Sequence, residues 1–181
     1  ADHELVMTMD TLVEGRHFPA DLPAHAVGFR SLATNLSDLA AMGADPAWCL
    51  LSLSLPSADM KWLDDFCEGF FALADEHHVS LVGGDLVRGP LSITIQATGF
   101  VPTGQALLRS GARAGENIVI GGVPGEAAAG LAQWQAGQRD SWLIERFCYP
   151  EPQCGLGKVL RGHATSCIDV SDGLLADLGH L

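Results

Sequence analysis

Residues 81–90 read Leu-Val-Gly-Gly-Asp-Leu-Val-Arg-Gly-Pro, a short apolar run followed by two glycines, an acid and a base. Residues 79–82, of which all but Ser80 are apolar, predict a buried strand. Gly83 and Gly84 can adopt backbone angles that other residues cannot, so a ligand or a second strand can approach the main chain here. We expect Asp85 at the end of this strand, although an Asp after two glycines is more often an ordinary turn residue.

Four other acids occupy comparable positions. Asp10 follows the apolar-rich segment 5–9, Asp38 lies within an otherwise apolar helical pattern, and Asp169 and Asp172 stand where another strand is expected to end. Neighbouring carboxylates repel each other unless a cation neutralises them, so these acids and Asp85 point to Mg²⁺ or another hard, oxygen-preferring ion. Because Mg²⁺ is typically completed by substrate phosphates, the pattern favours phosphate chemistry, with an arginine such as Arg88 or Arg109 assisting.

Composition narrows the class of protein. The 181 residues are 48% apolar and 18% charged, which is typical of a packed globular domain rather than a disordered chain. A net charge of −12 argues against nucleic acid or an anionic membrane as partner, and no apolar run is long enough to cross a bilayer. No signal peptide is visible and neither end resembles a natural terminus, so we expect a piece of a longer protein. The five cysteines are odd in number and lack a CxxC pair, which favours reduced core residues of a cytoplasmic protein.

Apolar spacing predicts the order of elements in the first part of the chain. Alternation predicts strands over residues 5–10, 47–55 and 91–98, and helical spacing predicts helices over 24–42 and from the caps Ser57 and Asp59 up to His77 and His78. Residues 11–23 predict a loop that carries His17. Ser31, Asn35 and Asp38 follow at helical spacing and share one face. That face is either solvated or turned toward a site, and composition favours the solvated face.

The second part is expected to begin near residues 105–111, where glycine and polar residues interrupt the pattern. Residues 118–120 predict a short buried strand, and the glycine-rich turn 121–125 after it lacks a phosphate-loop motif. Helices are expected over 126–136, 142–147 and 156–161. Residues 167–173 predict a strand that runs into a helix, with Ser171 or Asp172 as the N-cap.

Three segments resemble a known family: Asn-Leu-Ser-Asp-Leu-Ala-Ala-Met-Gly-Ala-Asp-Pro at 35–46, Gly-Gly-Asp with Arg-Gly-Pro within 83–90, and Ile-Asp-Val-Ser-Asp-Gly-Leu at 168–174. Their order is similar to that of the thiamine-monophosphate kinases. Those enzymes belong to a PurM-like superfamily with aminoimidazole ribonucleotide synthetase, selenophosphate synthetase and a hydrogenase maturation factor. The resemblance implies an α+β fold, with a mostly antiparallel sheet covered by helices on one face in an ATP- and Mg-binding domain at 1–104. It also implies an incomplete α/β domain at 105–181 and a homodimer whose N-terminal sheets pair into a barrel.

The resemblance also implies an activity and its residues. The activity is ATP-dependent phosphorylation of thiamine monophosphate to thiamine diphosphate by direct in-line transfer with several Mg²⁺ ions. Asp85 and Asp172 would be catalytic, and His17 would bind the thiamine phosphate. The residues implied to contact ATP are Gly84, Asp85, Arg109 and Ser171. The implied metal ligands are Thr8, Met9, Asp10, Asp38, Asp85, Asp169 and Asp172.

This sequence departs from the family at two places. Met9 stands where the family usually has Ser or Thr, so its backbone carbonyl is the group left to bind metal. The family's early Gly-Asp-Asp segment and its C-terminal lid over the thiamine rings lie outside residues 1–181. Two alternatives stay open: another ATP-dependent enzyme of the superfamily with a different acceptor, of the selenophosphate or aminoimidazole ribonucleotide synthetase type, and a nucleotide- or metal-binding module without catalysis.

Overall fold

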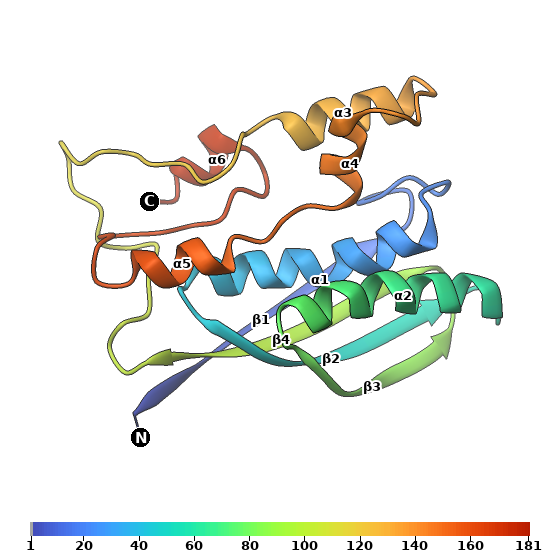
Figure 1. Cartoon of the computed structure of the whole chain (residues 1–181), viewed down its shortest axis with the longest axis horizontal. Helices are drawn as coiled ribbons and strands as arrows, with labels where there is room; N and C mark the ends of the chain where they lie inside the picture. Colours follow the sequence, from blue (N-terminus) through green and yellow to red (C-terminus); the bar gives the residue numbers. More distant parts are fainter. Residues whose placement is uncertain (1) are drawn as a thin grey trace.

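The computed structural model describes residues 2–181, which form a four-stranded sheet with helices on one face (Figure 1). The strand order is β1-β4-β2-β3, with β4 antiparallel to both of its neighbours and β3 parallel to β2 at the edge. The expected mostly antiparallel sheet is therefore confirmed. The strands are β1 (His3–Val13), β2 (Asp45–Leu55), β3 (Ser80–Arg88) and β4 (Ser92–Pro102).

Two long helices, α1 (Ala24–Ala41) and α2 (Met60–Glu76), cover the sheet because alternate strand residues are apolar on that side (Figure 1). On β1, Val6 and Leu12 are buried, whereas the residues between them that point the other way are exposed. On β4, Ile93 and Ile95 are fully buried under the helices. One face of the sheet thus forms the core, and the opposite face, which we call the open face, stays uncovered.

The two long helices approach each other at two glycines. A Cβ atom on Gly28 would lie 2.1 Å from the Phe66 carbonyl oxygen, and one on Gly69 would lie 1.9 Å from the His25 carbonyl oxygen. Neither site has room for a side chain, so the backbones of α1 and α2 pack in direct contact. At its start, α2 is capped by Asp59, whose carboxylate accepts from the Trp62 N–H at 3.1 Å as the sequence predicts.

The chain after β4 contributes four shorter helices. Of these, α3 packs against α4, and α5 lies along α1 (Figure 1). Lys158 and Arg161, at the end of α5, form ion pairs of 3.0 and 3.3 Å with Asp45 at the start of β2. The bounds are α3 (Glu126–Gln135), α4 (Trp142–Cys148), α5 (Cys154–Leu160) and α6 (Leu174–Leu178). The boundary between 1–104 and 105–181 stays a prediction.

Four strand predictions are wrong. The strand β3 is almost entirely exposed, because it is an edge strand, and it continues through both glycines so that Asp85 lies inside it. Similarly, β1 runs on to Val13 because Thr11 pairs with Thr94 of β4, which places Asp10 inside the strand. Residues 118–120 and 167–170 form no strand, since no strand within residues 2–181 lies beside them to take up their backbone hydrogen bonds.

Two predictions about side chains also need correction. The face of α1 that carries Ser31, Asn35 and Asp38 is not solvated, because Ser31 and Asn35 are buried. Of the five cysteines, all unpaired, Cys67 is exposed rather than in the core. Within residues 2–181, no helix combines the length and the apolar character needed to span a membrane.

Candidate functional site

Three of the predicted acids lie together at α1, and we call Asp10, Asp38 and Asp169 the acid cluster. Asp10 and Thr8 lie on the side of β1 that faces α1, and the Thr8 hydroxyl donates a hydrogen bond to the Asp38 carboxylate. From the other direction, the Ser37 hydroxyl donates to the Asp169 carboxylate at 3.2 Å. Segments far apart in the sequence therefore meet at one side of this helix.

The carboxylates of the acid cluster influence each other's ionisation. Burial raises the pKa of Asp10, and the negative charge of Asp38 raises it further, while a hydrogen bond from Thr34 and the charge of His17 act in the opposite direction. Burial and then the charge of Asp38 likewise raise the pKa of Asp169, against the hydrogen bond from Ser37. Within residues 2–181, no Lys, Arg or His forms an ion pair with any of the three acids.

This donor set suits a divalent cation in its chemistry. Carboxylate and hydroxyl oxygens are the ligands that Mg²⁺ prefers, and the cation would supply the positive charge that the acid cluster lacks. The part of the chain that the structure describes nevertheless contains no group of three His, Cys, Asp or Glu side chains close enough together to hold a metal ion. The acid cluster thus offers part of a coordination sphere, which further ligands have to complete.

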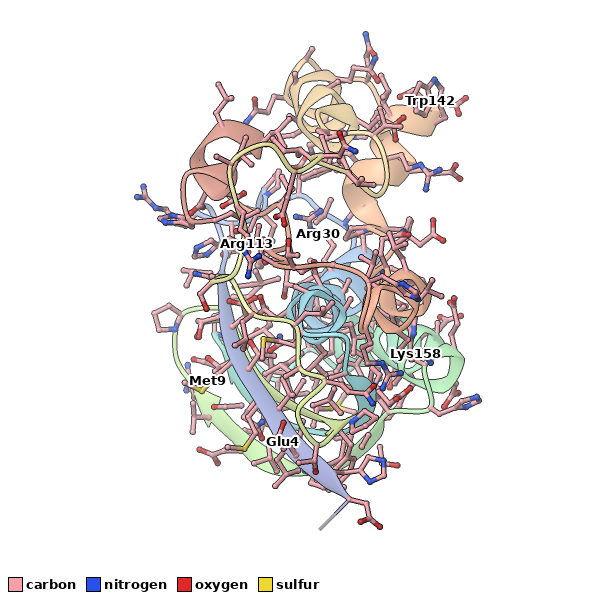
Figure 2. The ribbon with its side chains drawn as sticks, turned by 90° about the vertical axis from the view of Figure 1, so that its left-hand side faces the viewer. Glu4, Met9, Arg30, Arg113, Trp142 and Lys158 are labelled. Carbon is pink, nitrogen blue, oxygen red and sulfur yellow. The ribbon has the colours of Figure 1, made fainter. Side chains whose placement is uncertain are left out.

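Asp85 does not join the acid cluster within one copy of the chain. In the register of β2 and β3, Asp85 pairs with Ser52, whose side chain points to the open face, away from α1. Two strands also separate β3 from β1. Met9 lies on the same open face, with 67% of its surface exposed, and its side chain points outward in Figure 2.

Two of the four residues expected at the nucleotide, Gly84 and Arg109, differ in their surroundings. A Cβ atom on Gly84 would lie 1.8 Å from the Leu51 carbonyl oxygen, so the approach of β2 already requires glycine there. Arg109 is exposed and forms no ion pair with any of residues 2–181. Its guanidinium is therefore free to bind an anion.

The segment with Asp169, Ser171 and Asp172 is held by a residue that sequence reasoning missed. The predicted cap is wrong, because neither Ser171 nor Asp172 caps α6, and Gly173 occupies the N-cap position. Instead, the buried carboxylate of Asp177 accepts from the backbone N–H groups just before the helix. The signal available in the sequence was a single acid, Asp177, between the apolar positions of the predicted helix.

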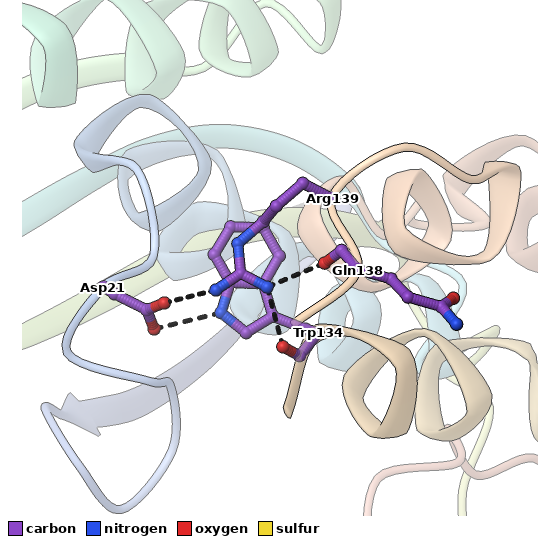
Figure 3. A network of polar contacts seen from close by, with 4 residues as sticks. All are labelled: Asp21, Trp134, Gln138 and Arg139. Atoms are coloured by element: carbon purple, nitrogen blue, oxygen red, sulfur yellow. Dashed lines mark hydrogen bonds and ion pairs between the residues drawn. The ribbon is translucent and has the colours of Figure 1, made fainter. Parts of the chain in front are cut away.

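Asp21, a second residue that sequence reasoning missed, anchors the loop that carries His17 (Figure 3). The Asp21 carboxylate accepts from the indole N–H of Trp134 at 3.0 Å and from the Arg139 guanidinium at 2.7 Å. These partners lower the pKa of Asp21, with the Trp134 hydrogen bond as the largest cause. The guanidinium also stacks on the Trp134 ring, 3.9 Å from its centroid. His17 itself accepts from the Val13 N–H through Nδ1 at 2.9 Å.

Comparison with known proteins shows which family the chain resembles. Residues 1–101 match the family described as AIR synthase related protein, N-terminal domain. Thiamine-monophosphate kinase of Escherichia coli (strain K12) is 49% identical over 183 residues, which cover 98% of this chain and 56% of that protein. The resemblance to thiamine-monophosphate kinases is thus confirmed, although the chain spans only about half the length of such relatives.

Solved structures agree in fold. The crystal structure of thiamine-monophosphate kinase from Stenotrophomonas maltophilia K279a superimposes with a TM-score of 0.95 at 49% identity, covering 99% of this chain and 60% of that one. AaThiL complexed with AMPPCP and TMP superimposes with a TM-score of 0.93 at 29% identity, again covering 99% and 60%. The chain therefore belongs to the family of AIR synthase related proteins, with residues 1–101 as the N-terminal domain of that family.

Proposed function

We propose that the protein containing this chain phosphorylates thiamine monophosphate to thiamine diphosphate with ATP. The observation that carries the proposal is the acid cluster, in which partly buried carboxylates converge with no ion pair to a Lys, Arg or His of residues 2–181. The likeness to thiamine-monophosphate kinases over 98% of the chain supports it, as does the neighbour complexed with AMPPCP and TMP. Five unpaired cysteines are consistent with a cytoplasmic enzyme.

The reaction is a direct, in-line transfer. A phosphate oxygen of thiamine monophosphate attacks the γ-phosphorus of ATP, the bond to the β–γ bridging oxygen breaks, and ADP leaves with that electron pair. Both substrates are anionic, and several Mg²⁺ ions would offset their charge. The groups that would hold these ions are Thr8, the carbonyl of Met9, Asp10, Asp38, Asp85, Asp169 and Asp172.

The protein's own groups orient the reactants. Because the Nδ1 atom of His17 accepts a hydrogen bond from the main chain, the proton of a neutral imidazole is on Nε2, which can donate to the phosphate of thiamine monophosphate. Arg109 offers an unpaired guanidinium to the triphosphate, and the exposed Ser171 offers a hydroxyl. Asp85 and Asp172 act closest to the transferred phosphoryl group.

A homodimer would bring Asp85 to this site. The sheet ends in two unpaired edges, β1 and β3, and closing them against a second copy makes a barrel in which no edge remains open. Asp85 and Met9 lie at opposite edges of the open face. A barrel that sets β3 of one copy beside β1 of the other would carry Asp85, and Gly84 with it, next to β1 and the Met9 carbonyl of the second copy.

The activity is tested with the full-length protein, ATP, Mg²⁺ and thiamine monophosphate. We expect equimolar ADP and thiamine diphosphate, and Asp38→Asn should lower kcat/KM by about 100-fold or more because it removes a shared metal ligand. Asp140→Asn, an exposed carboxylate outside the site, serves as the control. Consumption of ATP with selenide or formylglycinamidine ribonucleotide, and not with thiamine monophosphate, would contradict the proposal.

The shared site is tested by mixing two inactive variants. If Asp85 completes the site of the other copy, subunits with Asp38→Ala and subunits with Asp85→Ala form mixed dimers that have one intact site. Random exchange then restores about a quarter of wild-type activity, since half of the dimers are mixed and each has one working site of two. Mixing restores nothing if both acids act within the same copy.

A further inference from the structure

The carboxylate of Asp177 makes an unusual set of hydrogen bonds for a side chain in a five-residue helix. One of its oxygens, Oδ2, accepts from the backbone N–H groups of Ser171, Asp172 and Gly173, at 2.9, 3.1 and 3.1 Å. The side chain is 4% exposed, and within residues 2–181 no Lys, Arg or His forms an ion pair with it. Backbone dipoles therefore compensate a buried charge.

These hydrogen bonds decide which groups of the segment can meet a ligand. Three successive N–H groups that converge on one point form a site where a phosphate oxygen can bind. Here the protein's own carboxylate occupies that point. A ligand at this segment therefore meets the side chains of Ser171 and Asp172, which are exposed, and not the main chain.

Few other contacts fix the backbone of the segment. The N–H of Cys167 donates to the Leu108 carbonyl at 2.9 Å, and the Gly173 carbonyl accepts from the Asp177 N–H at 3.0 Å. Between these two points, the main chain forms no hydrogen bond to the backbone of another described segment. Gly173 has a φ of +129°, an angle that a side chain would disfavour. The carboxylate of Asp177 is thus the main restraint on residues 171–173.

The charge of the same carboxylate is also the weakest of the causes that raise the pKa of Asp169. Asp177 itself is turned toward backbone N–H groups and away from solvent. It therefore differs from Asp169 and Asp172, which remain available as metal ligands.

We propose that Asp177 is a positioning residue for the nucleotide: it holds residues 171–173 so that the side chains of Ser171 and Asp172 face the metal-bound triphosphate. This inference rests on the proposed function for the identity of the ligand. Its structural part, the restraint of residues 171–173, is measurable without any turnover.

The test compares Asp177→Ala and Asp177→Asn in the full-length protein. Alanine removes the acceptor, while asparagine keeps one oxygen but not the charge. We expect the affinity for Mg-AMPPCP, measured by calorimetry, to fall by about 10- to 100-fold for alanine and less for asparagine, as is typical of groups that orient metal ligands. The KM for thiamine monophosphate should stay within about twofold, because His17 lies on another loop. Asp64→Asn, an exposed acid on α2, is the charge-matched control.

Hydrogen exchange supplies the readout that does not depend on activity. Peptides that cover 167–178 should exchange faster in both variants, whereas peptides from α1 should be unchanged. Unchanged exchange at 167–178, or faster exchange with wild-type affinity for Mg-AMPPCP, would overturn the inference. If the alanine variant does not fold, hydrogen exchange at 167–178 and the affinity for Mg-AMPPCP of the asparagine variant test the inference. A wild-type protein that binds Mg-AMPPCP but forms no thiamine diphosphate would refute the proposed function alone.

Discussion

The carboxylate of Asp169 is partly buried next to that of Asp38, and both conditions raise its pKa. An acid whose pKa is higher in the folded chain than in the unfolded chain favours folding at low pH. That contribution is lost as the pH rises through the folded pKa. At neutral pH the ionised Asp169 therefore lowers the stability of the folded chain. A group that destabilises the protein it belongs to is typical of a binding site.

Asp169→Asn should accordingly raise the melting temperature at pH 7 by about 2 °C without added metal, because a neutral amide has no charge to bury. The gain should shrink as the pH falls through the folded pKa of Asp169 toward 3.8, the ordinary pKa of an aspartate. Mg²⁺ should reduce it too, since a bound cation stabilises the wild-type carboxylate. Thermal scans at several pH values, with and without Mg²⁺, measure this. Asp140→Asn, which removes an exposed charge, should show no such dependence.

Single residues differed in how far the sequence could reveal them. The acid cluster was predictable because Asp38 and Asp169 belong to motifs of a few neighbouring residues and Asp10 follows an apolar segment. Asp21 was not, because its partners Trp134 and Arg139 lie more than a hundred residues away in the sequence. The position of Asp85 on the open face also depended on strand pairing, which the motif around it does not encode.

Among the elements, α1 does most to build the site. It supplies Ser37 and Asp38, it lies between β1 and the segment that carries Asp169, and α2 presses against it from the other side. The contact with α2 depends on Gly28 and Gly69, where the backbones leave no room for a Cβ atom. The position of the acid cluster relative to the sheet is therefore set by helix packing.

Gly69→Ala should force the two helices apart. The new methyl group would start 1.9 Å from the His25 carbonyl oxygen, a distance that only backbone movement can relieve. We expect a loss of about 2–3 kcal/mol in the free energy of unfolding, the usual cost of inserting atoms into a tight contact. Urea unfolding measures it. In the control Gly155→Ala on α5, where nothing lies within 4 Å, the change should stabilise the helix by up to about 1 kcal/mol. Equal stability of the two variants would contradict this account of the contact.

Sequence periodicity predicted the helices better than the strands. The apolar stripes of α1 and α2 repeat over many turns, and α3, α4 and α5 also begin within two residues of the predicted positions. In contrast, the apolar run at 118–120 looks like a strand, yet it is exposed and unpaired among the described residues. A strand needs a neighbour to satisfy its backbone, and a local pattern does not show whether one is present.

At the scale of the whole molecule, the two faces of the sheet differ sharply. The helix-covered face contains the core, while the open face exposes Leu5, Met7 and Met9 along β1 at 58%, 70% and 67%. Apolar side chains in such a row are unusual on a free surface. Two copies together would carry a net charge of −24, twice the −12 of one chain, so the contact has to overcome charge repulsion. In the homodimer that we propose, burial of the open face would provide the driving force.

Met7→Asp should therefore separate the full-length dimer into monomers. Met7 lies in the middle of the exposed row, and a carboxylate buried there without a partner should weaken association by about 100-fold or more. Sedimentation equilibrium over a range of concentrations measures the dissociation constant, and added salt should strengthen the wild-type dimer by screening its charge.

The control is Met60→Asp at the start of α2, where the methionine is 64% exposed on the helical side. Because a shared site needs both copies, activity should fall with the dimer in Met7→Asp and stay in Met60→Asp. A Met7→Asp protein that remains dimeric would show that the open face is not the interface, and an active monomer would show that Asp85 is not required from a second copy.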